Sequence, residues 1–196
     1  MRRLRRRDLP VDTVALARYL LGKLIVRRIG RSTAAVRIVE TEAYVQNDAA
    51  CHAFRGPTKR NRSLYLAPGH AYVYLCYGTS YLLNVSSEPD GVGSGVLLRA
   101  AEPVSGLQWL RRSRTAVRDR DLCRGPGRLT EALGIDLRWD GVNLVGRGDL
   151  WLAEDGHDGG PIVVSPRIGI TKAANLPLRF FLHGNAHVSG PNRQHQ

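Results

Sequence analysis

Short runs of apolar and β-branched residues, separated by Gly, Pro and polar clusters, make up most of this chain and predict strands joined by tight turns. Strands are expected at residues 23–29, 34–44, 71–77, 81–87, 96–101, 142–152, 162–170 and 179–183. Helices are expected at residues 13–21, 106–113 and 127–133; Asp12 is placed to cap the first, and Gly22 and Gly134 to end the first and the last. Residues 45–68 are polar and show neither periodicity, which indicates a long ordered loop, and ordered loops of that length are uncommon unless they are functional.

Two carboxylates interrupt the second predicted strand. Residues 39–44 read Val-Glu-Thr-Glu-Ala-Tyr, and a period of two places Glu40, Glu42 and Tyr44 on one face. An unpaired buried carboxylate is costly, so either basic neighbours satisfy these acids or one of them lines a cleft and takes part in chemistry. The structural alternative is a salt-bridged or edge-exposed pair.

The charge of the chain indicates its partner. Lys and Arg number 29 against 17 Asp and Glu, for a formal net charge of +12, which favours binding to a polyanion such as nucleic acid. The cations form three groups: the N-terminal arm, then Arg55, Lys59, Arg60 and Arg62, and finally Arg111, Arg112, Arg114, Arg118, Arg120 and Arg124. Any one group is explained as a solvated face, whereas three groups rich in Arg favour contact with phosphates.

Chain length and cysteine content limit the domain organisation and the cofactors that we expect. A chain of 196 residues can bury one substantial core, and we expect a basic arm at residues 1–8 followed by one domain at residues 9–196. Asp8 and Pro10 stand where a signal peptide would be apolar, and no later run could span a bilayer, so we expect a cytoplasmic protein, nucleoid-associated if bacterial, with no membrane partner. Cys51, Cys76 and Cys123 match neither a disulfide framework nor a zinc motif, and neither a metal nor another cofactor is expected.

The second predicted hairpin is rich in tyrosine. Tyr72 and Tyr74 share one face, while Tyr77 lies at the tip, beside Gly78, with little sheet to pack against. In a DNA-binding protein a tip aromatic can act as a wedge between bases, and an aromatic further inside can stack on a base. The alternative is ordinary sheet packing.

Several ordered motifs carry a resemblance to a known family. They are Arg37-Ile-Val-Glu-Thr-Glu-Ala-Tyr44, His52-Ala-Phe-Arg-Gly56, Arg60-Asn-Arg62, Tyr72-Val-Tyr-Leu-Cys-Tyr-Gly78, Asn84-Val-Ser-Ser87, Val96-Leu-Leu-Arg-Ala100, Arg167-Ile-Gly-Ile170 and Pro177-Leu-Arg-Phe180. Together, from about Leu9 to Ser189, they resemble the alkyladenine (3-methyladenine, or methylpurine) DNA glycosylase family. The resemblance implies a mixed α/β (α+β) fold, a single compact domain with a curved antiparallel β-sheet flanked by helices. It also implies a monofunctional, metal-independent glycosylase that flips 3-methyladenine, 7-methylguanine, hypoxanthine or ethenoadenine out of duplex DNA and starts base excision repair as a monomer.

The resemblance also assigns the catalytic residues. Glu42 matches the general base that activates a water for attack on the anomeric carbon, and Arg99 matches an arginine beside that water. Such a carboxylate suits this chemistry because cleavage of an N-glycosidic bond develops positive charge on the sugar. No lysine lies in the apparent pocket segments, so no nucleophile for a lyase reaction is expected.

The remaining matched positions are assigned to the base and the duplex. Tyr44 and Tyr74 match the pair that sandwiches the flipped base, His52 closes the pocket edge, and Asn84 helps to exclude guanine. Tyr77 matches the side chain that enters the minor groove and fills the gap in the duplex. The chain departs from the family pattern in the loop before His52 and at Thr79-Ser80 on the hairpin tip.

Three other functions compete with this interpretation. A non-catalytic nucleic-acid-binding module of related fold would use the same cations and aromatics, but it has no reason to bury Glu42. A glycosidase with two carboxylates would use Glu40 and Glu42, which stand about 6.6 Å apart along a strand, but it has no use for a basic face. A metal-dependent nuclease would need a tighter cluster of acids than the sequence offers.

Overall fold

Strand β3 (Ser32–Tyr44) is the longest strand and organises the fold, because it pairs with three other strands along its length. The computed structural model describes residues 1–115 and 117–190. In this part of the chain nine strands form one antiparallel sheet with the order β1-β7-β2-β3-β6-β5-β4, and β9 joins β3 and β8 off this path. The other strands are β1 (Arg2–Arg3), β2 (Leu24–Ile29), β4 (Ala71–Cys76), β5 (Ser80–Ser86), β6 (Gly95–Ser105), β7 (Leu150–Glu154), β8 (Ile162–Ser165) and β9 (Arg179–Leu182). The mixed α/β class with an antiparallel sheet is therefore confirmed.

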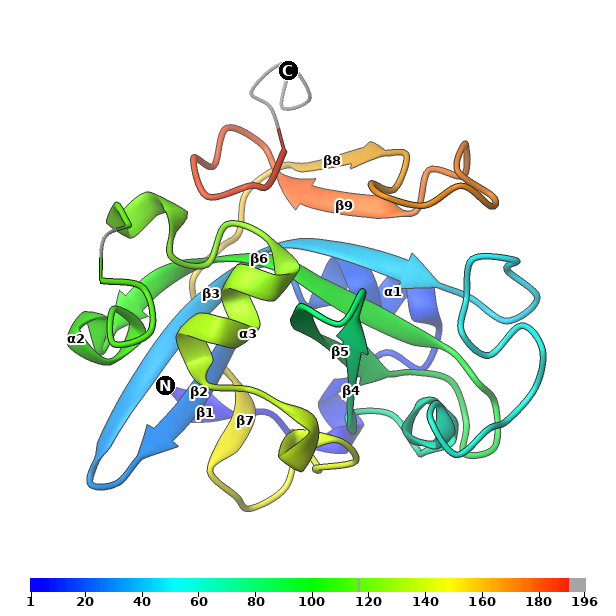
Figure 1. The fold of residues 1–196 in the computed structure, drawn as a ribbon, viewed down its shortest axis with the longest axis horizontal. Coiled ribbons are helices and arrows are strands. Elements are labelled where there is room, and N and C mark those ends of the chain that lie inside the picture. Colours follow the sequence, from blue (N-terminus) through cyan, green and yellow to red (C-terminus); the bar gives the residue numbers. More distant parts are fainter. Residues whose placement is uncertain (116, 191–196) are drawn as a thin grey trace.

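The helices are short and pack against the centre of the sheet. They are α1 (Thr13–Tyr19), α2 (Leu107–Leu110) and α3 (Pro126–Leu133), and single 3-10 turns form at Arg6–Asp8, Arg62–Tyr65, Asp119–Asp121 and Leu137–Trp139. The Asp12 side chain caps α1 by accepting from the Ala15 amide, as its sequence predicts. Helix α1 packs on β3 and β6, and α3 on β5 and β6 (Figure 1). No helix in the described part of the chain has the length and apolar character needed to cross a bilayer.

Both predicted hairpins form, and the loop between them is ordered. The β2–β3 turn and the loop between β3 and β4 lie at opposite sides of the molecule in Figure 1, with the loop beside the β4–β5 hairpin. Within this loop Nδ2 of the buried Asn61 side chain donates to the carbonyls of His52 (2.9 Å) and Gly56 (3.1 Å). These hydrogen bonds hold the loop in a defined conformation beside the β4–β5 hairpin.

Three predicted elements are much shorter than their sequence pattern indicates, while the others differ from it by a few residues at their ends. The strand expected at residues 142–152 begins only at Leu150, because the preceding residues turn and donate instead to the Gly69 carbonyl and the Asn143 side chain. The strand expected at 162–170 ends at Ser165, before Pro166, which has no amide to donate. The helix expected at 106–113 is only α2.

The predicted N-terminal arm contributes to the sheet. Strand β1 pairs with β7, Leu4 is fully buried, and Arg2 pairs with Asp8 and Glu154. The side chains at residues 5–7 remain exposed. The division of the chain at residue 8 stays a prediction, and residues 191–196 of the expected domain lie outside the described residues.

Candidate active site

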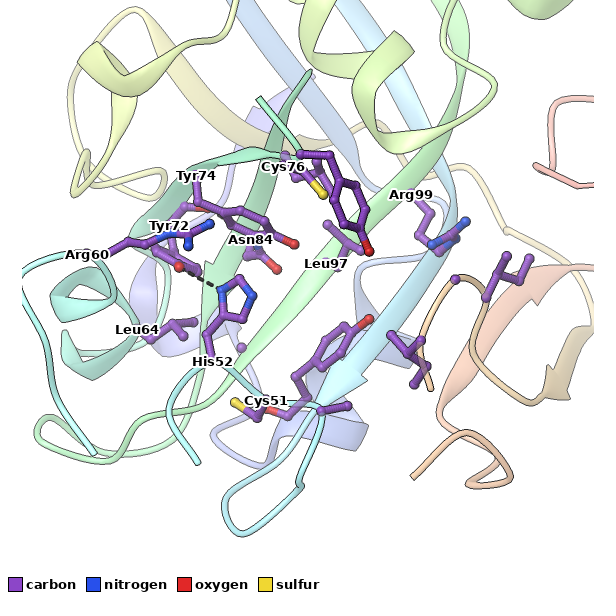
Figure 2. Close-up of a pocket in the computed structure, with 18 residues that line it drawn as sticks. Cys51, His52, Arg60, Leu64, Tyr72, Tyr74, Cys76, Asn84, Leu97 and Arg99 are labelled. Atoms are coloured by element: carbon purple, nitrogen blue, oxygen red, sulfur yellow. Dashed lines mark hydrogen bonds between the residues drawn. The ribbon is translucent and has the colours of Figure 1, made fainter. Parts of the chain in front are cut away.

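A cavity of about 370 Å³ opens between the β4–β5 hairpin, the ends of β3 and β6, and two loops, around residues 50–64 and 168–170. Figure 2 shows Tyr72, Tyr74, His52 and Arg60 gathered at one end of this cavity, with Arg99 at the other end. The cavity has the position of the base pocket that the family resemblance implies, and it is called the base pocket below. One end is therefore aromatic, and the other is charged.

Two buried carboxylates and two buried arginines form the charged end. Glu40 accepts from Arg99 Nε (3.0 Å), Arg179 Nε (2.7 Å) and the Ser189 amide (2.7 Å), and its side chain is fully buried. Glu42 is fully buried as well, and its Oε2 accepts from Arg99 Nη1 at 3.2 Å. Burial disfavours the charged guanidinium of Arg99, but the charges of Glu42 and Glu40 outweigh it and raise the pKa of Arg99. Arginines therefore balance the charge of both buried acids: Glu40 pairs with Arg99 and Arg179, and Glu42 pairs with Arg99.

Paired irregularities in β3 and β6 bring these groups together. Ile38 pairs with Ala101 and Glu40 with Ala100, so β3 carries one extra residue there; Thr41 then pairs with Leu98, so β6 carries Arg99 as its own extra residue. A β-bulge re-aims side chains locally. Here the two bulges place Arg99 beside both Glu40 and Glu42.

The carboxylate of Glu42 is held by three donors. In addition to Arg99, the Tyr44 hydroxyl donates to Oε2 at 2.9 Å, and the Ile168 amide donates to Oε1 at 2.8 Å. Burial, followed by the charge of Glu42, raises the pKa of Tyr44, so the phenol keeps the proton that it donates. Glu42 does not itself line the base pocket, whereas Tyr44, Arg99 and Ile168 do, so it stands directly behind the pocket wall.

Arg167 is a site residue that the sequence argument did not single out. Its guanidinium lies 4.6 Å from the Tyr44 ring centroid, forms a fully buried ion pair with Asp48, and donates to the Ala43 carbonyl at 3.0 Å. These contacts hold the Tyr44 ring in place, and they position the amide of the neighbouring Ile168 to donate to Glu42. The motif Arg167-Ile-Gly-Ile170 was a signal for this segment, although it did not reveal the contact.

The aromatic end is made by residues of β4, β5 and the loop after β3. Tyr72 and Tyr74 stack with centroids 5.3 Å apart, and His52 meets Tyr74 edge-on at 4.5 Å while its Nδ1 lies 2.9 Å from the Tyr72 hydroxyl. Burial, and then the charge of Arg60, lowers the pKa of His52 and favours the neutral imidazole. Asn84 is buried against the pocket, and its Nδ2 donates to the Tyr72 carbonyl at 3.2 Å. The unusual loop before His52 therefore still delivers this residue to the pocket.

Tyr77 is the most exposed large hydrophobic side chain in the described part of the chain. It is 90% exposed, borders the base pocket, and has a φ of 49° in the turn after β4. Positive φ is uncommon for a large residue, so a tight turn holds this ring out in solvent. It therefore does not pack the sheet.

The basic groups differ in how far acids neutralise them. Arg111, Arg114, Arg118 and Arg124 pair with Asp119, Glu131 and Asp121. In contrast, Arg55, Lys59, Arg60 and Arg62 are exposed and form no ion pair within the described residues. The segment beside the base pocket is consequently the more available anion-binding surface.

Within residues 1–115 and 117–190, no three His, Cys, Asp or Glu side chains lie close enough together to hold a metal ion. The three cysteines are free thiols, as expected, and Cys51 and Cys123 are buried.

Known proteins of similar sequence point to one family. The sequence model of methylpurine-DNA glycosylase (MPG) matches residues 7–186. A relative from Mesorhizobium japonicum is 59% identical over 186 residues, covering 95% of this chain and 89% of its own. Relatives from Paraburkholderia phytofirmans (48% identical, 96% and 88% covered) and Rubrobacter xylanophilus (47%, 89% and 90%) are similar as well. All three are provisionally named 3-methyladenine DNA glycosylases.

Proposed function

The chain belongs to the methylpurine-DNA glycosylase family, whose members hydrolyse N-glycosyl bonds in DNA, and on this basis we propose how this protein acts. It flips an alkylated or deaminated purine (3-methyladenine, 7-methylguanine, hypoxanthine or ethenoadenine) out of duplex DNA into the base pocket. A water activated by Glu42 then displaces the base, without a metal and without strand cleavage.

The observation that carries the proposal is the buried Glu42 carboxylate immediately behind an aromatic pocket. Oε2 accepts two hydrogen bonds and Oε1 accepts one within the described residues, and a carboxylate oxygen can accept two. One lone pair on Oε1 is therefore left for a water. Arg99 orients this carboxylate, and its negative charge stabilises the positive charge that develops on the sugar.

The aromatic end suits a flipped purine. We place the base between Tyr44 and Tyr74, with His52 at its edge and Asn84 against the position of the guanine amino group. A neutral His52 does not repel a cationic alkylated purine, and its ring can still exchange hydrogen bonds with the base. Because the cavity of about 370 Å³ lies within the range of small-ligand pockets, a single base is a suitable occupant.

The surface around the pocket suits the duplex. Arg55, Lys59, Arg60 and Arg62 would contact phosphates, so binding to undamaged DNA should weaken steeply with salt. Tyr77, exposed beside the pocket mouth, would fill the space that the flipped nucleotide leaves.

The test is release of free base from a duplex that carries one hypoxanthine, measured with and without EDTA, and in parallel from a duplex with one 7-methylguanine. We expect release at the same rate in both conditions, and an abasic strand that stays intact until it is treated with alkali. Binding without base release would instead identify a non-catalytic module, and loss of release in EDTA would contradict the metal-free mechanism.

A further inference from the structure

A second cavity, of about 350 Å³, adjoins the base pocket, and no step of the proposed reaction uses it. We propose that this cavity is a subsite for one phosphodiester of the damaged strand, next to the flipped nucleotide. In this subsite Lys172, which has no role in the proposed function above, binds the phosphate. The proposal rests on the proposed function, because it takes the occupant from DNA.

The charge of the cavity indicates an anion. Arg55, Arg60 and Lys172 line it together with Thr58, and no acidic side chain lines it. None of these three cations forms an ion pair within the described residues. Three uncompensated cations in one concavity repel one another, and a bound phosphate would relieve that repulsion.

The walls of the cavity are fixed by hydrogen bonds. Asn61 Oδ1 accepts from the Thr58 amide (2.6 Å) and hydroxyl (2.9 Å), while Asn61 Nδ2 donates to the carbonyls of His52 and Gly56. The Tyr65 hydroxyl ties the same loop at the Ala53 carbonyl at 3.2 Å. Since the loop is ordered in this way, the cavity exists before a ligand enters.

Lys172 reaches the cavity from a distant part of the chain. It follows the segment that supplies Ile168 to Glu42, and Arg167 Nη2 donates to the carbonyl of the next residue, Ala173, at 3.3 Å. The loop is therefore anchored on both sides of Lys172. A phosphate held there would have a fixed position relative to the loop that holds the Glu42 carboxylate.

The position of the cavity selects the linkage. Cys51, His52, Arg60 and Tyr72 line both cavities, so the two cavities adjoin, and the nearest linkage to a flipped nucleotide is one on its own strand. Figure 2 shows Arg60, Tyr72 and His52 together at the edge of the base pocket. Phe54, 51% exposed on the cavity wall, offers an apolar surface to a deoxyribose, which a free inorganic phosphate does not require.

The experiment measures affinity for a duplex carrying a stable abasic-site analogue, so that excision does not enter the result. Each phosphate within a few linkages of the lesion is replaced in turn by a neutral methylphosphonate, and binding is followed against salt for the wild type, Lys172→Gln and Arg31→Gln. Arg31 is a matched control because its exposed cation lies in the β2–β3 turn, on the far side of the molecule from the loop before β4 (Figure 1).

We expect Lys172→Gln to reduce the slope of log affinity against log salt by about one, and Arg31→Gln to leave it unchanged. One neutralised linkage beside the lesion should weaken the wild type and the Arg31→Gln variant equally, and should weaken Lys172→Gln less, because only Arg55 and Arg60 then face that linkage. An unchanged slope in Lys172→Gln, or equal sensitivity at every linkage, would overturn the subsite. Wild-type base release, assayed separately, distinguishes that outcome from failure of the proposed function, and an unchanged melting temperature confirms that the exposed variants fold.

Discussion

Replacing Glu42 with Gln removes the charge behind the base pocket while keeping the shape of the side chain. The amide can still present one oxygen to the Ile168 amide, but its NH₂ group then faces Arg99 Nη1, which is also a donor. Tyr44 can turn its hydroxyl to accept from the new NH₂ group. Packing and the base pocket should therefore survive, and the ionic contact with Arg99 should not.

The cost to folding follows from that lost contact. Breaking a buried ion pair by removing one partner costs about 3–5 kcal/mol, and we expect the lower end because Arg99 keeps its bond to Glu40. For a chain of this size, 1 kcal/mol shifts the melting temperature by about 2–4 °C, so a decrease of roughly 6–12 °C is expected. Loss of a general base should independently slow the chemical step by about 10² to 10⁴.

Glu40→Gln is the matched control. It also breaks a buried pair with Arg99 and in addition leaves Arg179 without a carboxylate in the described structure, so it should destabilise at least as much. Of the pocket-lining residues, only Arg99 donates to Glu40, whereas Glu42 accepts from three of them. The excision rate of Glu40→Gln should therefore remain within about tenfold of wild type at temperatures where the variant is folded.

The assay is single-turnover release of hypoxanthine, with lesion binding measured in parallel and both variants held well below their melting temperatures. The reasoning is refuted if Glu42→Gln excises within about tenfold of wild type, because loss of a general base should cost more. It is also refuted if the two variants lose activity equally, because stability alone would then explain both.

Three further outcomes are expected. Tyr77→Ala should change the free energy of unfolding by no more than about 0.5 kcal/mol, because the ring is exposed, yet it should slow excision from paired duplex far more than from single-stranded or bulged DNA; equal losses together with a lowered melting temperature would reject the wedge. His52 has a pKa below its ordinary value of 6.5, so the unfolded chain binds more protons below that pH and stability should fall on acidification; a melting series across pH should show a weaker fall in His52→Gln, and identical curves would contradict a neutral His52. Arg167→Met should lower the free energy of unfolding by about 3–5 kcal/mol, because it leaves the buried Asp48 carboxylate without its arginine. The double variant with Asp48→Leu should recover stability but still excise slowly. Full recovery of the excision rate would leave Arg167 a purely structural role.

The sequence predicted the local elements well where local chemistry decides them. Asp12 begins α1 as predicted, although the helix ends at Tyr19 and not at Gly22; period-two patterning placed both hairpins and put Glu40 and Glu42 on one face. Where residues bond outside their own strand, the pattern failed. The residues before Leu150 are apolar enough for a strand, but their backbone groups bind Gly69 and Asn143 instead.

The sequence by itself also determined the chemistry that this protein carries: a basic chain, acids in a buried strand, aromatics on a hairpin, and the motifs of its family. Only the tertiary structure decided which groups balance the charges of the buried acids and which distant residues meet in one site. Arg99 reaches both acids because bulges in β3 and β6 shift the register around it, and Arg179 and Ile168 reach them from the far end of the chain. Lys172 meets Arg55 and Arg60 across more than a hundred residues for the same reason. Periodicity records which face a side chain takes within one strand, whereas register and loop packing between distant segments are set by the folded chain as a whole.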